Sequence, residues 1–407
     1  MPKIAFLECA LCKTQVPADQ PATVCPVCAG SFYVRYDLSD LVGTDPRQVV
    51  GKAAVADLKR PWRGMWRYEA VLPSVTPVTL GEGWTPAIPS RRYENVVLKE
   101  EGANPTGTFK ARGLALAVTM AKHLGLTKLA VPSAGNAGGA LAAYAAAAGI
   151  ECHIFMPKDV PMANQVEGVA FGAHVTLVDG LISDCARIVN ERKAAEGWFD
   201  VSTLKEPYRV EGKKTMGYEL VEQNGWEYPD AVFYPTGGGV GLIGMWKAFL
   251  EMEALGWVKG KRPKMIAIQA AGCAPVAKAY DNGDEVSVMW KDAATFASGL
   301  RVPKPYGDRI ILDIVRESGG TVLALSDEKL FASVKDWASQ EGVLLSPEGA
   351  AATAGYDHLI SKGLLKPSDK VVLFNTGSGN KYTDVLAEAF GLVKPAQQTV
   401  AEDLAVR

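Results

Sequence analysis

The stretch LAVPSAGNAGGALAAYAAAA, residues 129–148, decides the fold class. Residues 129–132 form a short apolar run that predicts a buried strand, and the alanine-rich residues 138–148 predict a helix. Only a short glycine-containing turn separates the two. A strand that leads at once into a helix is the repeating unit of proteins whose parallel sheets are covered by helices on both faces.

The same alternation extends from this stretch in both directions. Further strands are expected at residues 96–99, 151–156, 174–178, 231–234, 265–268 and 370–374, and further helices at 113–124, 162–171 and 183–196. We therefore predict an α/β fold with two doubly wound, mainly parallel-sheet domains. In such folds, ligands bind at the carboxyl ends of the strands.

Changes in this pattern along the chain predict its division into domains. We expect a small cysteine knuckle at residues 1–36, a connector at 37–75, a large domain made of 76–112 and 216–395, a small domain at 113–215, and a loosely ordered tail at 396–407. The connector carries Trp62, Trp66 and Tyr68, and aromatic side chains favour packing against the body of the protein.

The composition excludes several classes of partner. Of the 407 residues, 48% are hydrophobic and 22% charged, as is usual for a globular enzyme, and the formal net charge of −2 does not favour nucleic acid or an anionic membrane surface. No apolar run reaches the ~20 residues that a membrane helix needs. The first residues lack the apolar segment of a signal peptide, so we expect a cytoplasmic protein. A homodimer is the commonest assembly for such a protein.

Four of the seven cysteines form two CxxC pairs that are separated by twelve residues. This spacing places four thiolates at the corners of a tetrahedral zinc site. Four protein ligands leave no open position on the metal, so the predicted zinc is structural. Its ligands are Cys9, Cys12, Cys25 and Cys28.

Asn104-Pro105-Thr106-Gly107-Thr108-Phe109-Lys110 is a turn that delivers a lysine to the start of a helix. A cation at a helix N-terminus opposes the helix dipole, which lowers the pKa of the amine. A neutral lysine amine forms an imine with an aldehyde. By itself, Lys110 also fits a solvated lysine on the surface.

A glycine-rich turn follows a later strand and opens a helix, where backbone N–H groups bind phosphate. Alone, it also fits a nucleotide loop or a tight turn, although it lacks the P-loop pattern. Its residues are Gly237, Gly238, Gly239, Val240 and Gly241. Together with Lys110 it predicts a ligand that is both an aldehyde and a phosphate, and pyridoxal 5′-phosphate (PLP) is such a ligand.

Two more loops suit this cofactor. Asn136 lies where a strand passes into a helix, so its amide either donates to the phenolate oxygen of PLP or caps the helix. Backbone N–H groups of Ser133, Ala134 and Gly135 are expected to bind the carboxylate of an amino-acid substrate. Thr376 follows the last strand, where its hydroxyl either caps a turn or faces the pyridine nitrogen. A hydroxyl there leaves this nitrogen largely neutral, which favours elimination and replacement over transamination.

Together these motifs resemble the fold type II PLP family, whose members include threonine synthase, threonine ammonia-lyase and cysteine synthase. Residues 81–86, GEGWTP, resemble a threonine-synthase motif, and residues 104–113, NPTGTFKARG, resemble that family's NPTGSFKDRG. The paired CxxC motif is also found in many threonine synthases. The combination favours threonine synthase within the family.

The resemblance implies roles for particular residues. Lys110 would be the Schiff-base lysine, Asn136 the partner of the phenolate oxygen, residues 237–241 the phosphate loop, and Thr376 the partner of the ring nitrogen. The implied substrate is O-phospho-L-homoserine, with Lys110 shuttling protons at Cα and Cβ after the substrate displaces it. Residues 206–209, EPYR, resemble a segment NPxR whose arginine binds the substrate phosphate, which here is Arg209.

Two positions depart from the family pattern, because Ala111 replaces an aspartate and Asn164 replaces a lysine on the helix after Pro161. Compensating cations would be Lys158, Lys205 or Lys213. Three other functions therefore stay open. They are an ammonia-lyase for threonine or serine, a β-replacement enzyme such as cysteate synthase, and a zinc-ribbon binding protein with an inactive α/β body.

Overall fold

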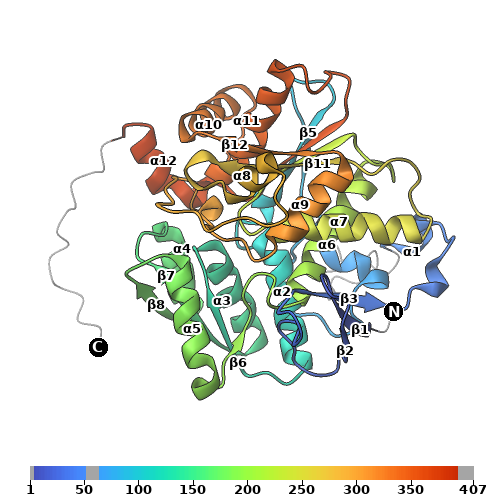
Figure 1. The fold of residues 1–407 in the computed structure, drawn as a ribbon, viewed down its shortest axis with the longest axis vertical. Coiled ribbons are helices and arrows are strands. Elements are labelled where there is room, and N and C mark those ends of the chain that lie inside the picture. The colour runs from blue at the N-terminus through green and yellow to red at the C-terminus, as the bar shows by residue number, and fades with distance from the viewer. Residues whose placement is uncertain (1–3, 52–63, 393–407) are drawn as a thin grey trace.

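The computed structural model describes residues 4–51 and 64–392 and contains three sheets. Two α/β lobes lie one above the other in Figure 1, the large one above and the small one below. Trp62 of the predicted connector and the predicted tail lie outside the described residues. Within the described part of the chain, no helix is long and apolar enough to cross a membrane.

The large lobe is built on a six-stranded sheet. Its strands lie in the order β12 (Thr321–Leu325), β11 (Lys264–Ala270), β10 (Ala231–Pro235), β13 (Val371–Asn375), β5 (Val96–Glu100) and β4 (Ala87–Pro89). All neighbours are parallel except β4 and β5. The strand predictions at 96–99, 231–234, 265–268 and 370–374 are confirmed within three residues, whereas β12 was not predicted.

Helices cover both faces of this sheet. They are α6 (Tyr208–Gln223), α7 (Val240–Ala254), α8 (Pro275–Asn282), α9 (Asp308–Ser318), α10 (Asp327–Gln340), α11 (Pro347–Ser361) and α12 (Thr383–Ala389). Side chains of β10 alternate between two cores, since Phe233 packs in the cluster that contains α11 and Tyr234 in the cluster that contains α7. This alternation with burial on both sides explains the continuously apolar strands.

The small lobe contains a four-stranded parallel sheet in the order β8 (His174–Val178), β7 (Glu151–Pro157), β6 (Lys128–Pro132) and β9 (Phe199–Asp200). Its helices are α2 (Lys110–His123), α3 (Asn136–Ala148), α4 (Met162–Ala170) and α5 (Ile182–Glu196). The predicted elements are confirmed, but α2 begins three residues and α3 two residues earlier than expected. The boundaries predicted after residues 112 and 215 fall inside α2 and α6, which pack against each other.

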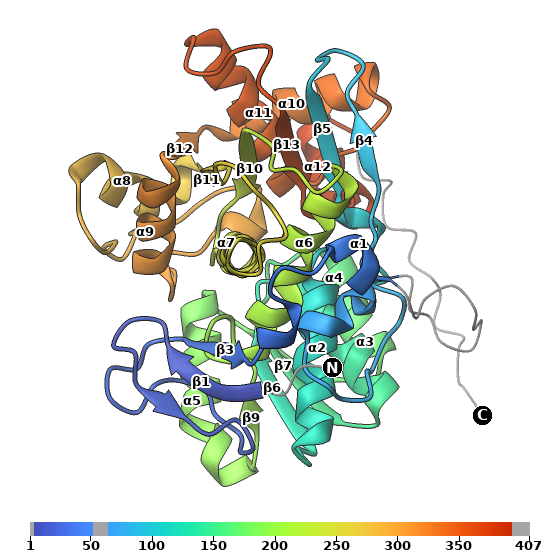
Figure 2. The same cartoon turned by 90° about the vertical axis from the view of Figure 1, so that its right-hand side faces the viewer.

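The N-terminal segment forms a third, antiparallel sheet of β1 (Ile4–Cys9), β2 (Gln15–Val16) and β3 (Phe32–Tyr36), followed by the short helix α1 (Pro46–Val49). In Figure 2 this sheet lies below α7 and beside the small lobe. The Tyr36 hydroxyl donates to Glu211 of α6 at 2.8 Å, which joins the segment to the body. Trp66 and Tyr68 of the connector are buried, as predicted for aromatic side chains that pack on the body.

Candidate active site

A cavity of about 300 Å³ lies at the carboxyl ends of strands from both lobes. The loops after β6, β10 and β13 line it, together with the start of α2. The structure therefore brings together most of the predicted site residues, although they span more than 250 residues of the chain. They are Lys110, Ser133, Ala134, Gly135, Asn136, Gly237, Gly238, Gly239, Val240, Gly241 and Thr376.

The turn that carries Lys110 is held by the loop after β13. The backbone N–H of Phe109 donates to the carbonyl oxygen of Thr376 at 3.0 Å, and the N–H of Ser378 donates to the carbonyl oxygen of Gly107 at 2.8 Å. The Thr108 hydroxyl accepts from the N–H of Lys110, so α2 starts at the lysine itself. The position of the lysine therefore depends on the last strand of the sheet.

Lys110 lies deep between the lobes, with its side chain partly exposed to the cavity. Burial and, to a smaller extent, the nearby charge of Arg209 lower the pKa of its amine to about 7, although Glu348 opposes the shift. The sequence predicted the direction correctly, but it assigned the cause to the helix terminus and missed desolvation. At neutral pH a large share of the amine is uncharged and able to attack an aldehyde.

The loop after β6 is shaped by Ser133, whose buried hydroxyl accepts from the N–H groups of Gly135 at 3.0 Å and Gly138 at 2.9 Å. Gly135 has a φ of +122°, and a Cβ there would lie 2.3 Å from the Asn164 side chain, so only glycine fits. Asn136, the first residue of α3, turns its amide nitrogen to the Tyr382 hydroxyl at 2.6 Å.

The glycine loop opens α7, a helix of 15 residues. Gly239 has a φ of +73°, and a Cβ at this residue would lie 2.2 Å from the Ile311 side chain. The loop thus brings bare backbone to the cavity wall at the positive end of a helix. Such a cradle fits the phosphate of PLP.

Arg209 is the one predicted cofactor- or substrate-binding residue that does not line the cavity. Its guanidinium is fully buried near Lys110, and Nη1 donates to the carbonyl oxygen of Val201 at 2.7 Å. Its Nε and Nη2 have no hydrogen-bond partner within the described residues. Burial lowers the pKa of Arg209 to about 10, so the group stays charged at neutral pH.

The lysines considered as replacements for a family cation lie in different places. Lys205 lines the cavity, whereas Lys158 is exposed beside Asp179. Lys213 is buried behind the cavity and donates to the carbonyl oxygen of Phe109. Asn164 is fully buried, and neither of its amide atoms has a partner in the described part of the chain.

Glu348 and Tyr382 also line the cavity and were missed by sequence reasoning. Glu348 sits in the first turn of α11 after the N-cap Ser346, and the pattern Ser-Pro-Glu is a recognisable helix start. That pattern does not say that the carboxylate faces a ligand. Tyr382 lies in a single 3₁₀ turn, Gly379–Tyr382, which carries no sequence signal for a site.

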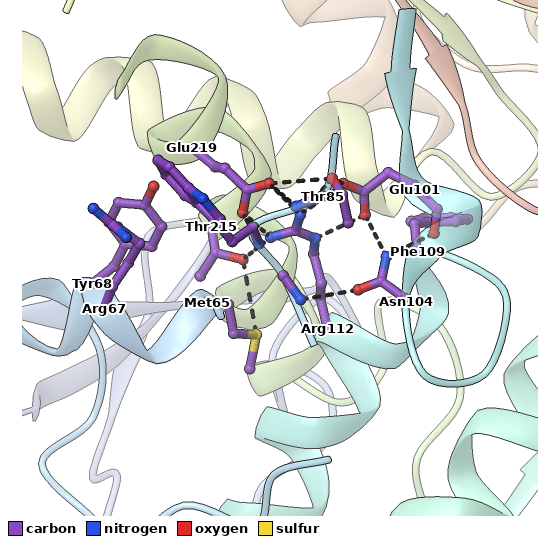
Figure 3. A network of polar contacts seen from close by, with 12 residues as sticks. Met65, Arg67, Tyr68, Thr85, Glu101, Asn104, Phe109, Arg112, Thr215 and Glu219 are labelled. Carbon is purple, nitrogen blue, oxygen red and sulfur yellow. Dashed lines mark hydrogen bonds and ion pairs between the residues drawn. The ribbon is translucent and has the colours of Figure 1, made fainter. Parts of the chain in front are cut away.

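A buried network of charges lies behind the lysine turn (Figure 3). Arg112, two residues after Lys110, donates to Glu101 at 2.7 Å and to Glu219 at 2.8 Å. Lys99 also pairs with Glu219 at 2.5 Å, so two cations balance two carboxylates. The network anchors α2 to α6 and to β5 beneath the cavity. Ala111, which replaces the family aspartate, is fully buried.

The four N-terminal cysteines come together as predicted. Their Sγ atoms all lie within 4.8 Å of one another, with Cys9 and Cys28 at 3.4 Å and Cys12 and Cys25 at 3.5 Å. A tetrahedral site with Zn–S bonds of ~2.3 Å needs S–S separations of about 3.8 Å. The donor set therefore fits zinc in both chemistry and spacing.

Comparison with known proteins agrees with this site. A family model described as pyridoxal-phosphate dependent enzyme matches residues 78–377. Threonine synthase from Methanosarcina acetivorans is 32% identical over 91% of both chains, and threonine synthase from Methanocaldococcus jannaschii is 30% identical over 94% of both.

Solved structures with the same fold include a fungal L-serine ammonia-lyase from Rhizomucor miehei. Its sequence is 22% identical, and the structures superpose with a TM-score of 0.63 over 74% of this chain and 97% of that chain. Diaminopropionate ammonia lyase from Escherichia coli is 19% identical with a TM-score of 0.64 and covers 77% of this chain and 89% of that chain. Together with the sequence matches, the shared fold shows that this chain belongs to the family of pyridoxal-phosphate dependent enzymes, in the lyase group that contains the threonine synthases.

Proposed function

We propose that this chain converts O-phospho-L-homoserine and water to L-threonine and inorganic phosphate, with PLP bound at Lys110. One observation carries the proposal: a single cavity unites a lysine whose pKa is about 7 with a glycine cradle at a helix N-terminus. The relatives named threonine synthase, at 30–34% identity over most of the chain, support the choice of substrate.

Four parts of the cavity wall would hold the cofactor. Lys110 would bind the aldehyde carbon, residues 237–241 the phosphate, Asn136 the phenolate oxygen and Thr376 the ring nitrogen. When bound, PLP supplies an electron sink beside the Cα of the substrate. The cradle at Gly239, where an added Cβ would meet Ile311, fits the phosphate of such a ligand.

The substrate would be held at its two anionic ends. Of the three N–H groups predicted to bind the carboxylate, that of Ser133 donates to the carbonyl oxygen of Phe155 at 2.9 Å and that of Gly135 to the Ser133 hydroxyl at 3.0 Å. We therefore assign the carboxylate to the N–H of Ala134. Arg209 is our candidate for the phosphate, because it is charged and two of its nitrogens have no partner within the described residues. Lys205 already lines the cavity and supplies a positive charge for the same group.

Lys110 would also move the protons once the substrate has displaced it from the cofactor. An amine whose pKa is about 7 both accepts and returns a proton near neutral pH. We assign it the proton transfers at Cα and Cβ that accompany loss of phosphate from Cγ and addition of water at Cβ.

We further propose a structural zinc ion on Cys9, Cys12, Cys25 and Cys28. The support is the spacing of their Sγ atoms, all within 4.8 Å. No role in the reaction follows, since four thiolates fill the coordination sphere.

A second candidate is an ammonia-lyase for threonine or serine. Asn164 favours it, because this buried amide stands where the family places a lysine. A substrate without a phosphate group needs no cation there. The two activities share the cofactor and differ in the substrate that is bound and in the products that are released.

The deciding experiment offers the PLP-loaded enzyme two substrates in parallel. With O-phosphohomoserine we expect equimolar inorganic phosphate and threonine, and with threonine little 2-oxobutanoate. Lys110→Ala serves as the control and is expected to form neither product. Release of 2-oxobutanoate from threonine without phosphate from phosphohomoserine would replace the synthase by the ammonia-lyase.

A further inference from the structure

Three side chains form a hydrogen-bonded chain along the cavity wall. The Asn136 amide nitrogen donates to the Tyr382 hydroxyl oxygen at 2.6 Å. Tyr382 in turn forms a hydrogen bond with the carboxylate of Glu348. All three residues line the cavity, and they come from α3, the last 3₁₀ turn and α11. The chain therefore crosses from the small lobe to the large one.

The carboxylate at one end determines the direction of this chain. Glu348 accepts at 2.7 Å from the backbone N–H of Gly299 and lies in the first turn of α11, where the helix dipole favours a negative charge. Burial raises the pKa of Glu348, whereas the hydrogen bond with Tyr382 and the charge of Lys110 lower it. In its ionised form the carboxylate only accepts hydrogen bonds, so Tyr382 then donates to Glu348 and its oxygen is left to accept from the Asn136 amide.

Nothing else in the described part of the chain holds the Asn136 side chain in this orientation. Its Oδ1 is buried and has no hydrogen-bond partner there. An amide has two N–H donors, and Tyr382 uses one of them. If the amide turned over, it would present an acceptor oxygen instead of a donor to a bound anion.

We propose that Tyr382 and Glu348 are positioning residues that keep an N–H of Asn136 directed at the phenolate oxygen of PLP, and thereby set the protonation of the Schiff base with Lys110. The inference rests on the proposed cofactor role of Asn136. It does not depend on which amino acid the enzyme converts.

A purely structural role for the same contact must be separated from this one. The turn that carries Tyr382 also joins the lobes through Lys381, which pairs with Glu167 of α4 at 2.6 Å. Other charged groups face the chain as well: Lys110 of α2 and Lys381 lie near Glu348, and Glu167 acts on Tyr382. Loss of Tyr382 would therefore act either on the amide or on the closure of the two lobes.

The test measures the pH titration of the visible absorbance of the PLP-loaded enzyme without substrate. Tyr382→Phe removes one hydroxyl and no charge. Loss of a donor to the phenolate makes that oxygen more basic, so the protonated Schiff base is stabilised. We expect the midpoint to rise by about one pH unit in Asn136→Ala, since a unit corresponds to ~1.4 kcal/mol and a charge-assisted hydrogen bond is worth slightly more. Tyr382→Phe is expected to raise the midpoint by at least half as much as Asn136→Ala does.

The double variant and a matched control complete the design. If Tyr382 acts through Asn136, the double variant Tyr382→Phe/Asn136→Ala shifts the midpoint no further than Asn136→Ala alone. Glu167→Gln breaks another contact between the lobes, the pair with Lys381. Because the charge of Glu167 also acts on Tyr382, we expect a midpoint shift well below that of Tyr382→Phe. If Tyr382→Phe fails to fold, Glu348→Gln replaces it, and the Asn136→Ala shift should then shrink in that background.

Three results would overturn the inference: an unchanged midpoint in Tyr382→Phe, additive shifts in the double variant, or an equal shift in Glu167→Gln. A wild-type protein that takes up no PLP would instead refute the proposed cofactor site itself. The two failures are therefore distinguishable.

Discussion

At the scale of single residues, the amine of Lys110 is the most reactive group that the structure identifies. Its pKa is about 7 instead of 10.5, and the amine is neutral above this value. We expect the apoenzyme to form its Schiff base with PLP at a rate that rises through pH 7 and then levels off. Stopped-flow measurement of the visible absorbance between pH 5.5 and 9 gives the midpoint, and a midpoint above pH 9 would contradict the burial of the amine.

Arg112 is the residue on which the buried charge network depends. It faces Glu101 and Glu219, and within the described residues its replacement by methionine leaves Lys99 as the one cation paired with these two carboxylates. Removing one partner of a buried pair costs about 3–5 kcal/mol, so we expect a loss of that size in the free energy of unfolding in urea. Arg187→Met, at an exposed ion pair on α5, is the matched control and should leave the midpoint unchanged.

The same network gives the stability of the protein a defined pH dependence. Burial acts to raise the pKa of Glu101 and of Glu219, but the charge of Arg112 outweighs it and holds both below the ordinary value of 4.5. The unfolded chain therefore takes up protons before the folded protein does. The contribution of the network is present above pH 4.5 and is lost as the pH falls below it.

At the scale of elements, the glycine loop that opens α7 leaves no room for a larger residue at Gly239. At Gly239 an added methyl group meets Ile311 at 2.2 Å, in a backbone with a φ of +73°. We expect Gly239→Ala to weaken PLP binding by about tenfold or more, because ~1.4 kcal/mol of strain already has that effect. The affinity for PLP is measured by equilibrium titration of the visible absorbance.

The control for this substitution lies just beyond the other end of the same helix. Gly256 has a similar φ of +69°, and no atom lies within 4 Å of an added methyl group there. Gly256→Ala carries the same backbone strain and is expected to bind PLP normally. Equal losses in both variants would mean that strain alone, and not the shape of the cradle, causes the effect.

The elements also show what a sequence can predict. The strands of residues 129–132 and 231–234 were found because both are continuously apolar, and the loops that follow them were correctly expected on one cavity. β12 (Thr321–Leu325) was not predicted, although its sequence TVLAL is largely apolar like those of the predicted strands. Glu348 and Tyr382 reach the cavity only through tertiary packing, so no local pattern reveals them.

At the scale of the whole molecule, the contacts that join the N-terminal sheet to the catalytic body include two hydrogen bonds of tyrosine hydroxyls. Tyr36 donates to Glu211 of α6, and the hydroxyl of Tyr306, at the cavity wall, donates to the carbonyl oxygen of Ala29 in the cysteine knuckle. A knuckle that loses its metal would loosen both contacts, because metal binding and local folding are coupled.

We therefore expect one zinc ion per chain by elemental analysis, and a fall of several degrees in the melting temperature after chelation or in Cys12→Ser. The melting temperature is expected to fall because the protein loses a ligand that binds only its folded state. Cys185→Ala, at an isolated buried cysteine, should keep the metal. A metal-free protein with unchanged stability would exclude the structural role.

The position of β13 has a consequence for how the enzyme is made. Residues 371–375 are translated after every other strand that the structure describes, yet they fill a slot in the interior of the large sheet, between β10 and β5. Until they emerge from the ribosome, the lysine turn lacks its backbone anchors, and Thr376 and Tyr382 cannot reach the cavity. We therefore expect a nascent polypeptide to retain no vitamin B6 in this pocket before residues 371–382 have left the ribosome.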